Sequence, residues 1–150
     1  MEIRVLNPDE RPQALALVSR VFAQFEAPDY TQQGIDTFFA FLANPEQVSA
    51  LTFFGAFLKD ELVGVIALRG TSHISLFFVD ARHQGKGVGR ALFHAAQAAC
   101  TECEMTVNSS PYAVGIYQKL GFHPLSGEQV TDGIRFTPMK RVQTQENPLC

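Results

Sequence analysis

The middle of the sequence contains a strand-like run that passes through closely spaced glycines into a helical pattern, an order that few folds share. The run ends at Val79, the glycines are Gly85, Gly87 and Gly89, and apolar residues at helical spacing continue to Ala99. Glycine lets backbone N–H groups approach a ligand without an intervening side chain, and a helix N-terminus presents unpaired N–H donors with a partial positive charge. The stretch therefore predicts an anion site suited to phosphate or pyrophosphate.

Positive charges gather around the same loop. The chain has a formal net charge of -3 and an isoelectric point near 5.8, yet residues 81–101 contain no Asp or Glu and include Arg82, Lys86 and Arg90. General binding to nucleic acid or to an anionic membrane requires several clustered cations on the surface. We therefore expect neither as a partner, and we expect one local basic site. Lys86 and Arg90 have an alternative interpretation as a solvated helix face.

Two well-known nucleotide-binding loops do not fit this spacing. The P-loop requires Gly-Lys followed by Ser or Thr, and here Gly85-Lys86 is followed by Gly87. The dinucleotide fingerprint G-x-G-x-x-G also fails, because the glycines fall at every second position. The loop therefore indicates a phosphate site outside both nucleotide-binding classes.

Hydrophobic periodicity predicts that the chain forms one α/β domain with a mixed sheet. A chain of 150 residues, 46% of them hydrophobic, suits a single domain, which we expect over residues 1–141 with a C-terminal tail at 142–150. Strand patterns fall at residues 2–6, 51–58, 62–68, 74–79, 104–107, 122–129 and 134–140. Helical patterns fall at residues 15–25, 35–42, 88–99 and 111–120, the second ending at Asn44-Pro45. The polar turn at residues 59–61 predicts an antiparallel meander.

Two motifs in this order give the chain a family resemblance. Gln84, Gly87 and Gly89 match the signature Q/R-x-x-G-x-G/A, and about 20 residues later Asn108 to Phe122 match the pattern N...A...Y-x-K-x-G-F. At these residues the sequence strongly resembles the GNAT superfamily of acetyl-CoA-dependent N-acyltransferases. The resemblance implies a GNAT-like fold, with a six- to seven-stranded, mostly antiparallel sheet, about four helices, and fourth and fifth strands that splay apart.

The same resemblance implies acetyl-CoA, or coenzyme A, as co-substrate. Its pyrophosphate would be bound through backbone N–H groups at Gln84, Gly85, Lys86, Gly87, Val88, Gly89 and Arg90. Its pantetheine arm would lie along Phe77, Phe78 and Val79, and Asn108 would face the arm across the splay.

Catalytic roles follow from the resemblance in the same way. The backbone N–H near Phe78 would polarise the thioester carbonyl, and Tyr117 would protonate the departing thiolate. A thiol leaving group with a pKa near 8.5 needs only a weak acid, which a positioned phenol supplies. The alternative interpretation of Tyr117 is a core aromatic residue on an amphipathic helix.

The general base is the least determined part of the site. An amine acceptor with a pKa of about 10.4 must lose a proton before it attacks. His73 is the first candidate, because it starts the fourth strand and titrates near neutral pH, and Glu26 is the second. Glu26, Asp29 and Tyr30 lie in the segment that usually walls the acceptor site in this family. A structural histidine, a solvated loop acid and a water chain remain alternatives.

Together these observations predict an N-acetyltransferase that moves acetyl to a primary amine of a small molecule or peptide by direct attack in a ternary complex. The alternatives are a non-catalytic CoA or acyl-CoA sensor and an interaction module. No metal site is expected, because Cys100 and Cys103 lack the further ligands that zinc needs. The absence of a secretory signal pattern and of a long apolar run predicts a cytoplasmic protein. A homodimer remains an alternative, because an exposed apolar face of the Phe-rich second helix would suit a dimer interface.

Overall fold

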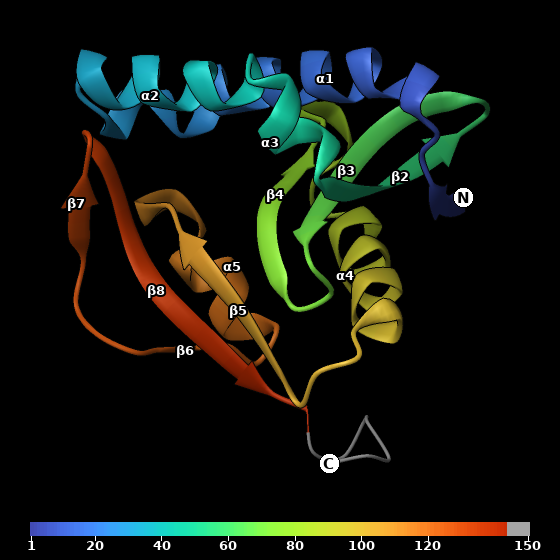
Figure 1. Cartoon of the computed structure of the whole chain (residues 1–150). Coiled ribbons are helices and arrows are strands. Elements are labelled where there is room, and N and C mark those ends of the chain that lie inside the picture. The colour runs from blue at the N-terminus through green and yellow to red at the C-terminus, as the bar shows by residue number, and fades with distance from the viewer. Residues whose placement is uncertain (144–150) are drawn as a thin grey trace.

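In the computed structural model, which describes residues 1–143, one sheet runs through the molecule between helical layers (Figure 1). The strand order is β1-β2-β3-β4-β5-β8-β6, and β7 pairs with β8. The strands are β1 (Glu2–Val5), β2 (Leu51–Leu58), β3 (Glu61–Arg69), β4 (His73–Val79), β5 (Glu104–Ser109), β6 (His123–Pro124), β7 (Gln129–Thr131) and β8 (Ile134–Val142). The α-helices are α1 (Arg11–Phe25), α2 (Gln32–Leu42), α3 (Pro45–Ser49), α4 (Val88–Ala99) and α5 (Val114–Lys119).

Strands β2, β3 and β4 form the antiparallel meander that the sequence predicts, and β1 extends it by pairing antiparallel with β2. Leu58 pairs with Glu61, and the two residues between them, Lys59 and Asp60, have φ of 49° and 65°. Two consecutive left-handed residues define the type I′ turn, whose twist matches that of the strands it joins. One face of the meander packs against α1 and α2, and the other packs against α4 and α5.

Strands β4 and β5 separate soon after they meet. They run parallel and pair only at His73 with Thr106 and at Ile74 with Val107. The rest of β4 therefore has an edge that no strand covers within residues 1–143. This separation confirms the predicted splay of the fourth and fifth strands, and Figure 1 shows β4 curving away from β5 and β8.

The element counts differ slightly from the prediction. The strand expected at residues 122–129 is divided into β6 and β7, which gives eight strands within residues 1–143. Both pieces pair with β8, and the polar stretch around Ser126-Gly127 separates them.

The short helix α3 is also additional, giving five α-helices within residues 1–143. Asn44-Pro45, expected as a helix end, instead begins α3: the Asn44 side chain accepts from Glu46 N and Gln47 N, and proline occupies the first turn. Strand β8 continues to Val142, and residues 144–150 of the expected tail lie outside the described residues.

Helix α2 crosses over to the hairpin formed by β7 and β8. At the tip of that hairpin the backbones of Gly34 and Gly133 pack so closely that neither position has room for a side chain. Beside this contact Thr37 Oγ1 donates a hydrogen bond of 2.7 Å to Asp132 O. The helical layer thus bridges the two halves of the splayed sheet, as Figure 1 shows where α2 lies above β7 and β8.

No helix within residues 1–143 combines the length and the apolar character that crossing a bilayer requires.

Candidate active site

The open edge of β4 borders a cleft of about 450 Å³. Its walls come from the end of α1, the second half of β4, the glycine loop with the start of α4, and the segment that leads into α5. Its lining residues are Val21, Phe25, Glu26, Phe77, Phe78, Val79, Gln84, Gly85, Gly87, Gly89, Arg90, Tyr112, Ala113, Ile116 and Tyr117. The splay of the sheet thus brings most of the predicted site residues together.

The glycine loop ends in an uncapped helix N-terminus. Gly87 is the N-cap of α4 with φ of 87°, no side chain caps the first turn, and that turn contains no acid. A Cβ at Gly85 or Gly87 would meet no heavy atom within 4 Å. The N–H groups of the first turn have no partner within the helix. Free donors, a positive helix end and open space therefore fit an anionic group such as a diphosphate.

The other side chains of the glycine loop differ in whether they face the cleft, the solvent or the core. Gln84 Nε2 donates 3.0 Å to Val79 O, which fastens the loop to the end of β4. Arg90 lines the cleft, whereas Lys86 is exposed and does not line it. Val88 is buried in the core, so only its backbone is available to a ligand.

The register of β4 decides which of its backbone donors face the cleft. Phe78 pairs with Val65, and Asp80 N donates 2.8 Å to Val63 O in the same antiparallel ladder. Hydrogen-bonded pairs alternate along such a ladder, so Phe78 N–H faces β3. The N–H groups of Phe77 and Val79 face the open edge instead. The N–H groups that face the open edge near Phe78 are thus those of its two neighbours.

Tyr117 forms part of the cleft wall from α5. Its ring lies 6.0 Å from the Phe77 ring and 5.5 Å from the Phe122 ring, measured between centroids. Burial raises the pKa of the Tyr117 hydroxyl far above its usual 10, and the charge of Glu26 adds to the rise. The hydroxyl therefore stays protonated at neutral pH and is available as a donor.

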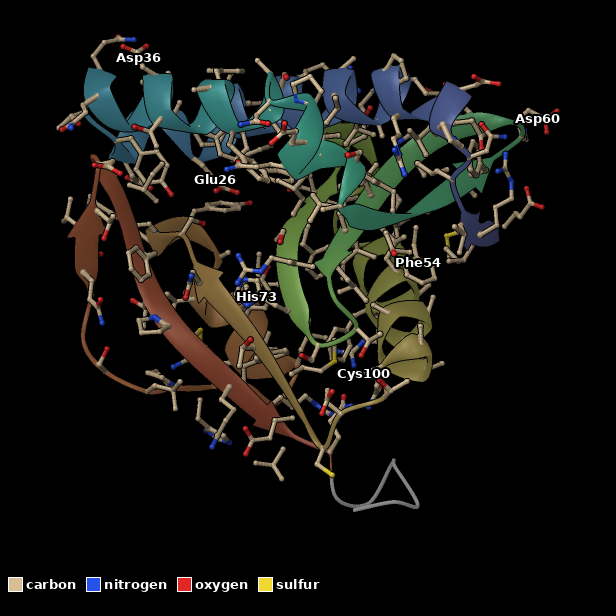
Figure 2. All side chains as sticks on the ribbon, viewed as in Figure 1. Glu26, Asp36, Phe54, Asp60, His73 and Cys100 are labelled. Atoms are coloured by element: carbon tan, nitrogen blue, oxygen red, sulfur yellow. The ribbon has the colours of Figure 1, made fainter. Side chains whose placement is uncertain are left out.

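Glu26 lies at the C-terminus of α1 and brings a carboxyl group into the same cleft (Figure 2). Burial raises its pKa to about 7, the nearby Asp29 charge adds to the rise, and the nearby Ser110 hydroxyl opposes it. Within residues 1–143 no ion pair neutralises Glu26. Ser110 Oγ is buried and completes no hydrogen bond there. A carboxyl with a pKa near neutrality has the proton affinity that a general base needs.

His73 and Asn108 are not among the residues that line the cleft. His73 Nδ1 lies 2.8 Å from Thr106 Oγ1, at the first of the two rungs where β4 and β5 pair. Burial lowers the pKa of His73 to about 4, with the Arg69 charge contributing. Asn108 follows the last of these rungs on β5 and is exposed.

Several lining residues were not among the predicted ones: Val21, Phe25, Tyr112, Ala113 and Ile116. The Phe25 and Tyr112 rings stack 5.4 Å apart, which joins the end of α1 to the segment before α5. Tyr112 and Ala113 fall inside the second motif, which was the available signal. Val21 and Phe25 belonged only to the apolar pattern of a helix, which did not mark them as site residues. Within residues 1–143 no three His, Cys, Asp or Glu side chains gather closely enough to hold a metal ion.

The comparison with protein families agrees with this geometry. Residues 26–142 match the family described as acetyltransferase (GNAT) domain, which is more than half of the chain. The chain therefore belongs to the GNAT acetyltransferase family, an acyltransferase class that uses acetyl-CoA. Among curated protein sequences none matches this chain.

Solved structures share the fold at low sequence identity. A GCN5-related N-acetyltransferase from Rhodopseudomonas palustris has a TM-score of 0.82 at 20% identity, covering 94% of each chain. The apo form of YjaB from Escherichia coli has a TM-score of 0.72 at 23% identity, covering 94% of this chain and 97% of that one. The PaiA N-acetyltransferase from Thermoplasma acidophilum, solved in complex with coenzyme A, has a TM-score of 0.68 at 18% identity, covering 95% and 99%. The mixed α/β fold is thus a GNAT fold.

Proposed function

We propose that this protein is an acetyl-CoA-dependent N-acetyltransferase that transfers acetyl directly to a primary amine of a small molecule or peptide. The observation that carries the proposal is one cleft that joins an uncapped helix N-terminus, a buried tyrosine and a carboxyl with a pKa near 7. Acetyl-CoA supplies an acyl group on a thiol leaving group. Glu26 and Tyr117 supply the base and the acid that the transfer needs.

Cofactor binding uses backbone groups more than side chains. The diphosphate is held by N–H groups from Gln84 to Arg90, with the Arg90 side chain beside them. The pantetheine arm then follows the open edge of β4 from Val79 towards Phe77. Because the Phe77 ring lies beside Tyr117, the reacting end lies near Phe77 N–H, which donates to the thioester oxygen. One fixed donor of this kind contributes about 3 to 4 kcal/mol.

Glu26 and Tyr117 then act in sequence. The ammonium form of the acceptor first loses one proton to solvent. The neutral amine nitrogen bonds to the thioester carbon, Glu26 takes the proton that this nitrogen then gives up, and the carbon–sulfur bond breaks. Tyr117 gives its hydroxyl proton to the departing sulfur. The negative charge of Glu26 raises the pKa of Tyr117, so proton uptake by Glu26 makes Tyr117 a better acid as the sulfur departs. Afterwards a proton moves from Glu26 to Tyr117 through solvent.

Release of free thiol tests this function. Acetyl-CoA is incubated with amines, polyamines, amino acids, aminoglycosides and peptides, and CoA binding is measured separately by calorimetry. An acetyltransferase binds CoA and releases thiol above background with at least one amine class. Binding without thiol release from any acceptor would identify a sensor, and absence of binding would remove the cofactor assignment.

A further inference from the structure

The turn that follows Glu26 is tied to β8 by two reciprocal hydrogen bonds. Tyr30 donates its hydroxyl to Arg135 O over 3.3 Å, and Arg135 Nη1 donates to Asp29 O over 2.9 Å. Each residue gives a side-chain donor to the backbone of the other segment, about one hundred residues away in sequence. The pair therefore fixes both the distance and the direction between this turn and β8.

Arg135 is itself held firmly by its own hairpin. Its Nε and Nη2 donate to the two carboxylate oxygens of Glu128 over 3.1 and 3.2 Å. A guanidinium is planar, so a two-point bond to a carboxylate also fixes the direction of its remaining N–H groups. The donor that reaches Asp29 O is therefore preoriented.

The tied turn determines where Glu26 lies. The 3-10 turn Ala27–Asp29 begins directly after it, with Asp29 N donating to Glu26 O over 3.0 Å and Tyr30 N donating to Ala27 O over 3.0 Å. The Tyr30 ring also packs 5.6 Å from the Phe22 ring of α1. Any displacement of Tyr30 would therefore be transmitted to Glu26 through bonds and packing.

From this connection we propose that Tyr30 and Arg135 are positioning residues that keep the Glu26 carboxyl inside the cleft. The inference rests on the proposed function, in which Glu26 is the base. Neither residue lines the cleft, so neither is a catalytic residue. A carboxyl displaced by about 1 Å from its acceptor loses a large part of its effect on rate.

The groups that face Glu26 make the direction of the effect predictable. Asp29, Tyr30 and Tyr117 interact with it electrostatically, and the nearby Ser110 hydroxyl lowers its pKa. The dominant influence on the pKa of Glu26 is burial, which is lost if the turn loosens. Loosening therefore lowers the pKa of Glu26 towards 4.5.

The test is a carboxyl carbon NMR titration of Glu26 in the full chain, with the resonance assigned through Glu26→Gln. Tyr30→Phe and Arg135→Gln each remove one reciprocal bond. Thr37→Val is the matched control, because it removes the 2.7 Å bond to Asp132 O, which ties the same helical layer to the same hairpin away from Glu26. We expect Glu26 to titrate at least about 1 pH unit lower in the first two variants. It should be unchanged in the third.

Three results would overturn the proposal: an unchanged titration in Tyr30→Phe, an upward shift in Arg135→Gln, or an equal downward shift in Thr37→Val. Turnover is measured in parallel and should fall at least about 10-fold in the two positioning variants. The titration needs no turnover. A wild-type protein that releases no thiol therefore contradicts the proposed function while the positioning result still stands or fails by itself.

Discussion

His73 Nδ1 lies 2.8 Å from Thr106 Oγ1 across the rung where β4 and β5 first pair. The next rung, Ile74 with Val107, is the last before the strands separate. Beside them Thr106 N donates 2.8 Å to Ser72 O, so the same point is held by backbone as well as side chains. This junction fixes where the splay begins, and with it the length of open β4 edge that faces the cleft.

We expect His73→Gln to change stability without changing the pH dependence of turnover near neutrality. The pKa of His73 in the folded protein, about 4, lies below its usual 6.5, so the unfolded chain binds more protons between these values. Wild-type stability therefore falls as pH drops from about 6.5 towards 4. Thermal unfolding at pH 7 and pH 5 should show a smaller loss in His73→Gln. Disappearance of the acidic limb of the pH-rate profile in this variant would restore His73 as the base.

Replacing Gly87 with Asp should remove CoA binding and leave the fold intact. Asp is one of the side chains that occur most often with a left-handed backbone such as that of Gly87, and the position has open space around it. Its carboxylate would occupy the helix N-terminus and repel a diphosphate there, so we expect affinity to fall at least about 100-fold. Gly70→Asp is the control, since Gly70 also has positive φ and open space but lies in the β3–β4 turn. Calorimetry that finds equal affinity in both variants contradicts the anion site.

Glu26→Gln should lower turnover by at least about 100-fold and abolish the acidic limb of the pH-rate profile. In the wild type that limb should rise through about pH 7, because Glu26 acts as a base only when it is deprotonated. The same raised pKa means that wild-type stability falls as pH rises from 4.5 through 7, since the folded state binds more protons than the unfolded chain. Glu26→Gln should therefore gain thermal stability relative to the wild type at pH 8. Retention of the limb would assign the base elsewhere.

Tyr117→Phe should lower turnover at least about 10-fold with little change in CoA affinity. The variant keeps the ring contacts with Phe77 and Phe122 and removes only the hydroxyl. Tyr112→Phe is the control, because Tyr112 lines the same cleft but is 41% exposed, unlike the buried Tyr117. Steady-state kinetics and calorimetry on both variants decide the role, and equal turnover in Tyr117→Phe and the wild type removes Tyr117 from the mechanism.

Two helical glycines should respond in opposite ways to alanine. Gly34→Ala places a methyl group against the Gly133 carbonyl, which we expect to cost about 1 to 3 kcal/mol of unfolding free energy. Gly115→Ala adds a methyl group with no heavy atom within 4 Å and should gain about 0.5 to 1 kcal/mol from helix propensity. Urea unfolding of both variants measures the difference. Equal stabilities would mean that the contact between α2 and the β7–β8 hairpin is not closely packed in solution.

Local sequence was sufficient to predict a feature where neighbouring residues alone determine its structure. The type I′ turn at Lys59-Asp60 and the glycine loop both depend on residues that are adjacent in the chain. It was insufficient at Asn44-Pro45, because these residues are compatible with both the end of one helix and the start of the next. The choice depends on whether the following residues have somewhere to pack, and Val48 of α3 is buried in the core.

The candidate site likewise has parts that local motifs predicted and parts that only the packing of distant segments showed. The glycines, the basic span and Tyr117 were identified from motifs, whereas the choice between His73 and Glu26 as base depended on burial and on where each side chain lies. The N–H groups on the open edge of β4 belong to the neighbours of Phe78, which only the pairing with β3 shows.

Short-range spacing was enough to predict the order of most strands and helices, the glycine loop and the family. The packing of distant segments was needed to show that Glu26 and Tyr117, 91 positions apart in the sequence, line one cleft, and that His73 instead contacts Thr106. A pKa depends on burial and neighbouring charges, and both are set when distant segments pack together.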